Sequence, residues 1–216
     1  MTAGGAGEIA VLDYGIGNLG SAYKALLHLG APARLVHEAA EVDGAAGVVL
    51  PGVGAFGACA AALERTGLAD AARRAVDAGT PFLGICVGFQ LLYEGSDEDP
   101  AAEGLAILPG VVRRLSGTVK HPQMQWNVLD RIGTGHGLLA DVPAPAWVYF
   151  VHSYAPEVTP DTTSTCDYGG AVTASAERPR LWGTQFHPEK SGPVGLHILT
   201  NFVRSVDAPE PVPGRG

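Results

Sequence analysis

Cys86 is the side chain of this sequence whose type and setting are best suited to chemistry, because it lies between Gly84 and Gly88. An apolar run at 82–85 predicts a buried strand before it, and the apolar residues of 89–93 predict a short helix after it. In such a glycine-x-nucleophile-x-glycine turn the nucleophile has a strained backbone, and neighbouring side chains would clash. The helix N-terminus also favours the thiolate. The pattern therefore indicates a nucleophilic cysteine rather than a buried core cysteine.

A base for this nucleophile is predicted at His187, which follows an apolar strand expected at 181–186. The next residue is a proline, which restricts His187 to an extended conformation, and Glu189 follows it. Because residues i and i+2 of an extended segment point the same way, Glu189 could accept a hydrogen bond from the imidazole and fix its tautomer. Cys86, His187 and Glu189 would then be nucleophile, base and orienting carboxylate. His152 is the alternative base, although no carboxylate follows it at that spacing.

A possible oxyanion hole follows the strand expected at 47–50, where the sequence reads Pro51-Gly-Val-Gly54. Glycines on both sides of Val53 leave the backbone free to change conformation and its N–H groups accessible. Such N–H groups can stabilise an oxyanion. The alternative interpretation of this segment is a plain turn.

The elements that must position these groups alternate between strand and helix in the first half of the chain. Besides the strands at 47–50 and 82–85, we expect strands at 8–13 and 34–37 and helices to about residue 30, at 57–64 and at 68–78. This order predicts a mostly parallel sheet with helices on both faces, and catalytic groups gather beyond the carboxyl ends of such strands. The Gly15-x-Gly17 pair lacks the third glycine of a dinucleotide-binding fingerprint and is interpreted as a strand-to-helix turn. Asn18 and Ser21 could face a partner from this edge.

The second half of the chain is richer in β-structure and is expected to be partly antiparallel. Residues 96–103 are interpreted as an acidic loop. The remaining expected elements are strands at 111–115, 126–129, 147–151 and 181–186, a hairpin of 163–167 with 171–174, and a final helix at 193–205.

Composition limits the class of protein. The chain has 216 residues, and we expect one domain at 8–206 between a flexible lead-in at 1–7 and a disordered tail at 207–216. A net charge of −8 argues against a nucleic-acid partner, and no apolar run is long enough to cross a membrane. The cysteines Cys59, Cys86 and Cys166 have neither metal-site nor disulfide spacing, which favours the cytoplasm. We expect no metal and no cofactor.

Two segments together resemble the class I, or triad, glutamine amidotransferases. They are GICVGFQ at 84–90 and QFHPEKS at 185–191. Further segments resemble one group within this class, the glutaminase subunits of imidazole glycerol phosphate synthase, an enzyme of histidine biosynthesis. These segments are DYGIGN at 13–18, PGVGAF at 51–56, FVHSY at 150–154 and the Lys190-Ser191 pair. The resemblance covers residues from about 8 to 205.

The resemblance implies a three-layer, flavodoxin-like α/β fold and an activity, the hydrolysis of L-glutamine to glutamate and ammonia. It implies the triad Cys86, His187 and Glu189. The oxyanion hole would come from the Gly52–Val53 peptide and the backbone of Val87. Glutamine would bind beside Gly54 and Gln90.

The resemblance further implies a heterodimer with a (βα)8-barrel cyclase subunit. Ammonia would pass to it and react with a ribulosyl aminoimidazole carboxamide intermediate, giving imidazole glycerol phosphate and the purine precursor AICAR. The residues expected at that interface are Asn18, Ser21, Trp126, Asn127, Tyr154 and Lys190. The family commonly has Pro-His-Met-Gly-Trp-Asn where this chain has Pro122-Gln-Met-Gln-Trp-Asn127. Gln123 and Gln125 therefore leave the details of docking open.

Three alternatives remain at this point. One is a glutaminase subunit of the anthranilate or aminodeoxychorismate synthase type, which would favour histidine where this chain has Phe89 and serine where it has Lys190. Another is a non-catalytic binding module on the same fold. The third is a cysteine hydrolase of this architecture without an ammonia-accepting partner.

Overall fold

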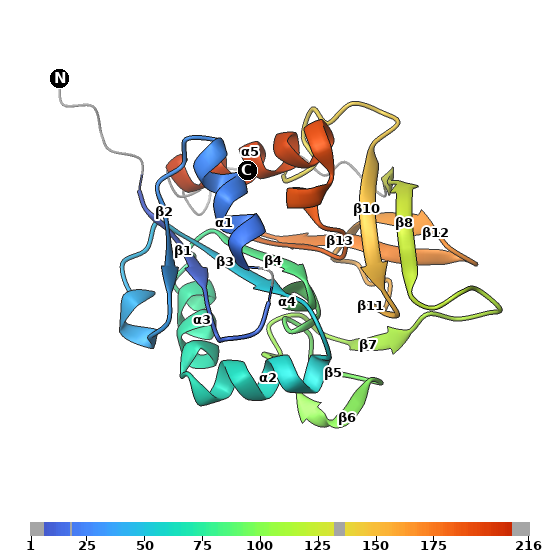
Figure 1. Cartoon of the computed structure of the whole chain (residues 1–216), viewed down its shortest axis with the longest axis horizontal. Coiled ribbons are helices and arrows are strands. Elements are labelled where there is room, and N and C mark those ends of the chain that lie inside the picture. Colours follow the sequence, from blue (N-terminus) through green and yellow to red (C-terminus); the bar gives the residue numbers. More distant parts are fainter. Residues whose placement is uncertain (1–6, 18, 132–136, 209–216) are drawn as a thin grey trace.

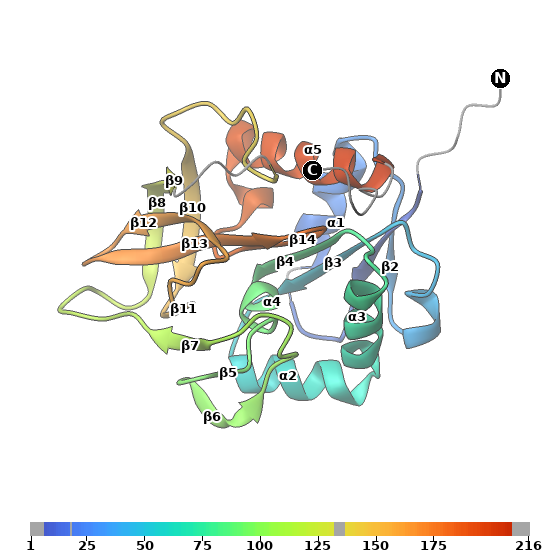
Figure 2. The same cartoon turned by 180° about the vertical axis from the view of Figure 1, so that it is seen from behind.

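A central sheet of eight strands organises the computed structural model, which describes residues 7–17, 19–131 and 137–208. The strand order is β2-β1-β3-β4-β14-β13-β12-β9. Helices α1 and α5 cover one face, and α2 and α3 cover the other, so the molecule has three layers (Figures 1 and 2). The predicted fold class is therefore confirmed.

The first half of the chain supplies the parallel part of this sheet. Its elements are β1 (Ile9–Leu12), α1 (Leu19–His28), β2 (Ala33–Val36), the 3₁₀ turn η1 (Ala39–Glu41), β3 (Gly47–Gly52), α2 (Phe56–Arg65), α3 (Leu68–Asp77), β4 (Phe82–Cys86) and α4 (Val87–Gln90). Strands β1 and β3 are buried along their whole length, as expected for parallel strands covered on both faces. The parallel register places Gly52 beside Cys86, so these two strands end at the same edge of the sheet.

The second half supplies the antiparallel part and two smaller sheets. Its elements are β5 (Gly95–Ser96), β6 (Asp99–Glu103), β7 (Val111–Arg114), β8 (Gln123–Val128), β9 (Asp130–Arg131), β10 (Trp147–His152), β11 (Tyr154–Pro156), β12 (Thr162–Asp167), β13 (Ala171–Arg178), β14 (Leu181–Thr184), the 3₁₀ turn η2 (Pro188–Lys190) and α5 (Gly192–Asp207). Strand β14 returns parallel to β4, whereas β12 and β13 form the predicted antiparallel hairpin. Strands β8 and β10 form a separate antiparallel pair that stands beside the main sheet (Figure 1).

The loop predicted at 96–103 is wrong in part, because Asp99–Glu103 forms strand β6 and pairs with β5. The sequence of β6 has low strand propensity and contains Pro100, which is tolerated here because β6 is the outer strand of its sheet. Asp99 also packs directly on α2, where a Cβ added to Gly57 would meet its carboxylate at 2.1 Å. Tertiary contact therefore overrides local preference in this segment.

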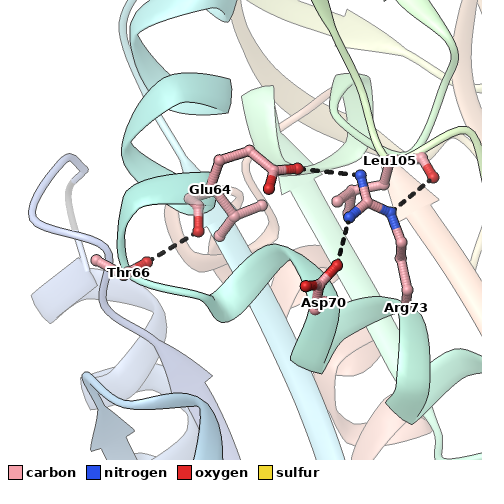
Figure 3. A network of polar contacts seen from close by, with 6 residues as sticks. Glu64, Thr66, Asp70, Arg73 and Leu105 are labelled. Atoms are coloured by element: carbon pink, nitrogen blue, oxygen red, sulfur yellow. Dashed lines mark hydrogen bonds and ion pairs between the residues drawn. The ribbon is translucent and has the colours of Figure 1, made fainter.

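The corner between α2 and α3 is held by Arg73, whose guanidinium meets Glu64 at 3.1 Å and Asp70 at 2.9 Å (Figure 3). Its Nε also donates to the carbonyl of Leu105 at 3.4 Å. Thr66, at the corner itself, donates back to the carbonyl of Leu63. Exposed ion pairs contribute little stability, so this network mainly fixes the angle between the two helices.

The lead-in and the tail predicted on either side of the domain lie largely outside the described residues. That is true of 1–6 in the predicted lead-in and of 209–216 in the predicted tail. Asp207, predicted as the first tail residue, is the last residue of helix α5. Within 7–17, 19–131 and 137–208, no helix has the length and apolar character needed to cross a membrane.

Candidate active site

Cys86 ends strand β4 in a backbone conformation that L-residues rarely adopt, with φ 55° and ψ −112°. The residues two positions before and two positions after it must be glycines. A Cβ on Gly84 would lie 2.9 Å from the carbonyl oxygen of Gly88, and a Cβ on Gly88 would lie 1.8 Å from the carbonyl oxygen of Leu50. The predicted strain and the predicted steric need for both glycines are therefore confirmed.

The helix after Cys86 is shorter than the sequence indicated, since α4 is a single turn, Val87–Gln90. Only a few peptide dipoles align there, so the helix contributes less to the thiolate than a long helix would. Gln185 provides a second polar contact that the sequence analysis did not assign. Its side-chain amide lies 3.8 Å from Cys86 Sγ and also accepts a hydrogen bond from Gln90 at 3.1 Å.

His187 and Glu189 are paired as predicted, with Nδ1 and Oε1 2.8 Å apart. Both side chains are almost completely buried. The route to this contact differs from the prediction. His187 is extended, but Pro188–Lys190 forms the 3₁₀ turn η2, so Glu189 reaches the imidazole through a turn and not along a strand.

Strand β10 fixes the position of His187 from the other side. The backbone N–H of His187 donates to the carbonyl of Tyr149 at 3.0 Å. Ser191 ties the same two segments together, because its hydroxyl accepts from the Tyr149 N–H at 3.0 Å and donates to the His187 carbonyl at 2.6 Å. Ser191 is buried, and through these two hydrogen bonds it helps to position the imidazole of His187. The sequence analysis did not assign this role.

The charge of His187 follows from its surroundings. Burial alone lowers the pKa of His187, but the interactions with Cys86 and Glu189 outweigh it and raise that pKa well above its usual value. Its Nε2 has no hydrogen-bond partner among the described residues. The raised pKa favours the protonated imidazole, which lies beside Cys86.

His152, the alternative base, has the opposite character. Its Nδ1 lies 2.8 Å from the carbonyl of Tyr154, so that nitrogen carries the proton of the neutral ring. Burial is the main reason that the pKa of His152 falls to about 4, and the charge of His187 lowers it further. Without a carboxylate partner, His152 is poorly suited to be the charged acid of the reaction.

The loop after β3 completes the site from the opposite side. Gly52 lies beside Cys86 in the strand ladder, and a Cβ there would meet the backbone nitrogen of Gly88 at 2.6 Å. Gly54 has φ +102°, which favours glycine. Gly52 is thus required for close approach to the turn, whereas Gly54 is required for its backbone angle.

These groups open on one cavity of about 260 Å³. Gly52 and Glu189 do not line it, but its walls include seven of the predicted site residues: Val53, Gly54, Cys86, Val87, Gln90, Tyr154 and His187. Glu98 also lines it and accepts from the N–H of Phe56 at 2.8 Å. The sequence analysis missed Glu98, because it is one of several neighbouring acidic residues and nothing in the sequence distinguishes it from them.

The residues predicted to face a partner differ in exposure. Trp126 is 49% exposed, Lys190 is exposed, and Ser21, Asn127 and Tyr154 are half-buried, whereas Asn18 lies outside the described residues. Of the two unusual glutamines, Gln125 is exposed but Gln123 is fully buried, with its amide 3.6 Å from Cys166 Sγ. Gln123 therefore faces the interior, and only Gln125 bears directly on a docking surface.

Comparison with known proteins gives concordant results. A family model described as glutamine amidotransferase class-I matches residues 10–206. The chain is 44% identical to the imidazole glycerol phosphate synthase subunit HisH of Moorella thermoacetica over 196 residues, which covers 90% of this chain and 93% of the relative. It is also 44% identical to the HisH subunit of a Synechococcus strain over 212 residues, with 96% and 98% covered.

Solved structures resemble this fold at lower sequence identity. One glutamine amidotransferase crystal structure has a TM-score of 0.73 at 18% identity and covers 93% of this chain and 99% of that one. The structure of PurLQS from Thermotoga maritima has a TM-score of 0.71 at 18% identity, with the same shares covered. At this identity the likeness concerns the fold alone.

Proposed function

Because this chain belongs to the class I glutamine amidotransferases, and within them to the HisH glutaminase subunits of imidazole glycerol phosphate synthase, we propose that Cys86, His187 and Glu189 are its catalytic triad. The family acts in histidine biosynthesis as the subunit that takes nitrogen from glutamine. The observation that carries the assignment is the shared cavity: the strained Cys86 and His187 both line it, and Glu189 is paired with His187 behind it. A nucleophile, a base and an orienting carboxylate in this arrangement support acyl transfer.

The reaction proceeds through a thioester. The Cys86 thiolate attacks the carboxamide carbon of glutamine, which becomes tetrahedral, and the π electron pair of the C=O bond moves to the oxygen to give an oxyanion. Protonated His187 gives its proton to the amide nitrogen, the C–N bond breaks, and ammonia leaves a glutamyl thioester on Cys86. A water molecule then loses a proton to His187, adds to the thioester carbon and releases glutamate with the sulfur restored.

Backbone N–H groups at the Gly52–Val53 peptide and at Val87 stabilise the oxyanion in this scheme. Support comes from the position of Val53 and Val87, which both line the cavity next to Cys86. Donors of this kind each contribute a factor of roughly 100–1,000 to the rate.

The other walls suit the amino-acid end of glutamine. Glu98 brings a carboxylate to the cavity, which complements an α-ammonium group. Gln90 and Gly54 line the same space. The Gln90 amide donates to Tyr154 O at 2.9 Å and to Gln185 at 3.1 Å, so its orientation is fixed before glutamine binds.

Ammonia needs a protected route to its acceptor, because in neutral water it is mostly ammonium, which is not nucleophilic. We therefore propose that a cyclase subunit docks beside the cavity as the second member of a heterodimer and consumes the ammonia. Two exposed side chains, Trp126 and Lys190, support this surface. The half-buried residues of the proposed surface are Ser21, Asn127 and Tyr154. Asn18 is a further proposed contact.

Glutaminase turnover tests the proposal, measured for the chain alone, with the cyclase, and with the cyclase and its nucleotide ligand. We expect slow hydrolysis by the chain alone and faster hydrolysis in the liganded complex, because rotation of the Gly52–Val53 peptide would supply or withdraw one oxyanion donor. Full activity in the isolated chain would contradict this control. No hydrolysis in any of the three states would contradict the function.

A further inference from the structure

Two buried side chains lie beneath the loop that follows β3, and neither belongs to the proposed triad. Tyr14 follows strand β1 and is 3% exposed, whereas Cys59 is in helix α2 and is 0% exposed. They come from different elements, one from the loop after a sheet strand and one from a covering helix, and both contact the same four-residue segment, Pro51–Gly54. Both are polar groups whose placement in the core needs a partner.

Each of these side chains holds one carbonyl of the loop. The Tyr14 hydroxyl donates to the carbonyl oxygen of Pro51 at 2.9 Å. The Cys59 thiol donates to the carbonyl oxygen of Val53 at 3.4 Å. These carbonyls belong to the peptides on either side of Gly52–Val53, so the two donors bracket the peptide that carries the proposed oxyanion N–H.

We propose that Tyr14 and Cys59 are positioning residues that anchor the two flanking peptides, so that only the Gly52–Val53 peptide between them rotates. This inference rests on the proposed glutaminase function and adds residues to it. With both neighbours anchored, opposite changes in ψ of Gly52 and φ of Val53 turn one peptide while the chain on each side stays in place. Without an anchor, the same motion spreads over several peptides and the N–H is no longer aimed at the cavity.

The surroundings keep both donors in place. Burial is the main reason that the pKa values of the Tyr14 phenol and the Cys59 thiol are raised. Raised pKa values favour the protonated forms, which can donate hydrogen bonds. A Cβ on Gly52 would also meet the Tyr14 hydroxyl at 2.8 Å. Tyr14 is therefore packed against the backbone at the point where the rotation begins.

The first test is Tyr14→Phe, which removes one hydroxyl and keeps the ring, assayed in the complex with the cyclase and its ligand. We expect kcat for glutamine hydrolysis to fall by roughly 5- to 50-fold, less than the full loss of an oxyanion donor. The KM for glutamine should be unchanged, because the oxyanion exists only after binding. Tyr23→Phe is the matched control, since the Tyr23 hydroxyl makes no hydrogen bond to the described residues.

A second readout separates loop positioning from damage to the nucleophile. Alkylation of Cys86 by iodoacetamide displaces iodide at a saturated carbon and forms no oxyanion. Its rate, followed at Cys86 by peptide mass mapping, should therefore be the same in Tyr14→Phe and wild type. A parallel loss of alkylation and hydrolysis would overturn the inference.

Cys59 is tested by a pair of substitutions. Cys59→Ala removes the donor to Val53 and should lower kcat as Tyr14→Phe does, whereas Cys59→Ser keeps a donor and should retain most of the wild-type kcat. Wild-type kcat in both Tyr14→Phe and Cys59→Ala would overturn the inference. A wild-type complex without glutaminase activity would refute the proposed function instead, so the two failures are distinguishable.

Discussion

At the residue scale, the proposed chemistry depends on two histidines that share a cavity but differ in charge. His187 has a buried carboxylate partner at 2.8 Å, whereas His152 has only a backbone carbonyl. Their surroundings therefore move the two pKa values in opposite directions, upward for His187 and downward for His152. Separation of this kind favours His187 over His152 for the proposed acid–base role.

Substitution of the pair should give graded losses. We expect His187→Asn to reduce glutamine hydrolysis nearly as far as loss of Cys86 does, because nucleophile and base act as a unit. Glu189→Gln should cost less, because Glu189 orients and charges the imidazole but does not transfer the proton. Steady-state kcat values of both variants in the liganded complex provide the measurement, and wild-type activity in His187→Asn would transfer the role to His152.

Stability should depend on pH through His152. The unfolded chain binds a proton below the ordinary pKa of 6.5, whereas the folded chain resists it down to about 4, so stability falls as pH decreases through that window. We expect His152→Asn to flatten this part of the curve of unfolding free energy against pH. His28→Asn, at an exposed helix position, is the control. Parallel curves for wild type and His152→Asn would contradict the assignment of this pH dependence to His152.

At the element scale, the strand-to-helix turn at Cys86 is the feature that the sequence predicted best. Gly84 and Gly88 are needed because no side chain fits at their positions, and the structure shows which backbone atoms a Cβ at each position would clash with. Strand β6 and the turn η2 were missed for the opposite reason, since β6 forms through its contact with α2 and η2 through its ties to β10. Glu98, Gln185 and Ser191 likewise acquire their places through contacts between segments distant in sequence.

The turn also gives a prediction about stability. Gly88→Ala would place a Cβ 1.8 Å from the carbonyl oxygen of Leu50, so α4 would have to move away from β3. We expect the free energy of unfolding to fall by about 2 kcal/mol or more, as for other overpacked core positions. Gly20→Ala in α1 is the control, because its Cβ would meet nothing within 4 Å and alanine favours the helix. Equal urea midpoints for wild type and Gly88→Ala would show that the turn relaxes.

At the scale of the whole molecule, the site lies at one edge of the sheet, and the β8–β10 pair stands next to it (Figure 1). Strand β10 connects the two regions, because its Tyr149 contacts both the Trp126 ring and the backbone of His187. A partner that binds Trp126 would therefore contact, through Tyr149, the strand that positions the proposed base. This arrangement offers a physical link between docking and turnover.

Lys190 should contribute to that link. It follows Glu189, is exposed, and makes no ion pair within the part of the chain that the structure describes. We expect Lys190→Ala to leave basal turnover of the isolated chain unchanged and to reduce the stimulation by the cyclase, because a salt bridge to the partner would be lost. Lys24→Ala, at an exposed position of α1, is the control. Unchanged stimulation in Lys190→Ala would remove this residue from the mechanism.

The most direct measurement of the central claim uses Cys86→Ala in the complex with the cyclase. Both the hydrolysis of glutamine and the synthesis of imidazole glycerol phosphate from added ammonium salt are measured on the same preparation. If Cys86 serves only the amide chemistry, glutamine hydrolysis is abolished while ammonia-dependent synthesis keeps its wild-type rate. Glutamine hydrolysis at a substantial fraction of the wild-type rate in Cys86→Ala would contradict the account.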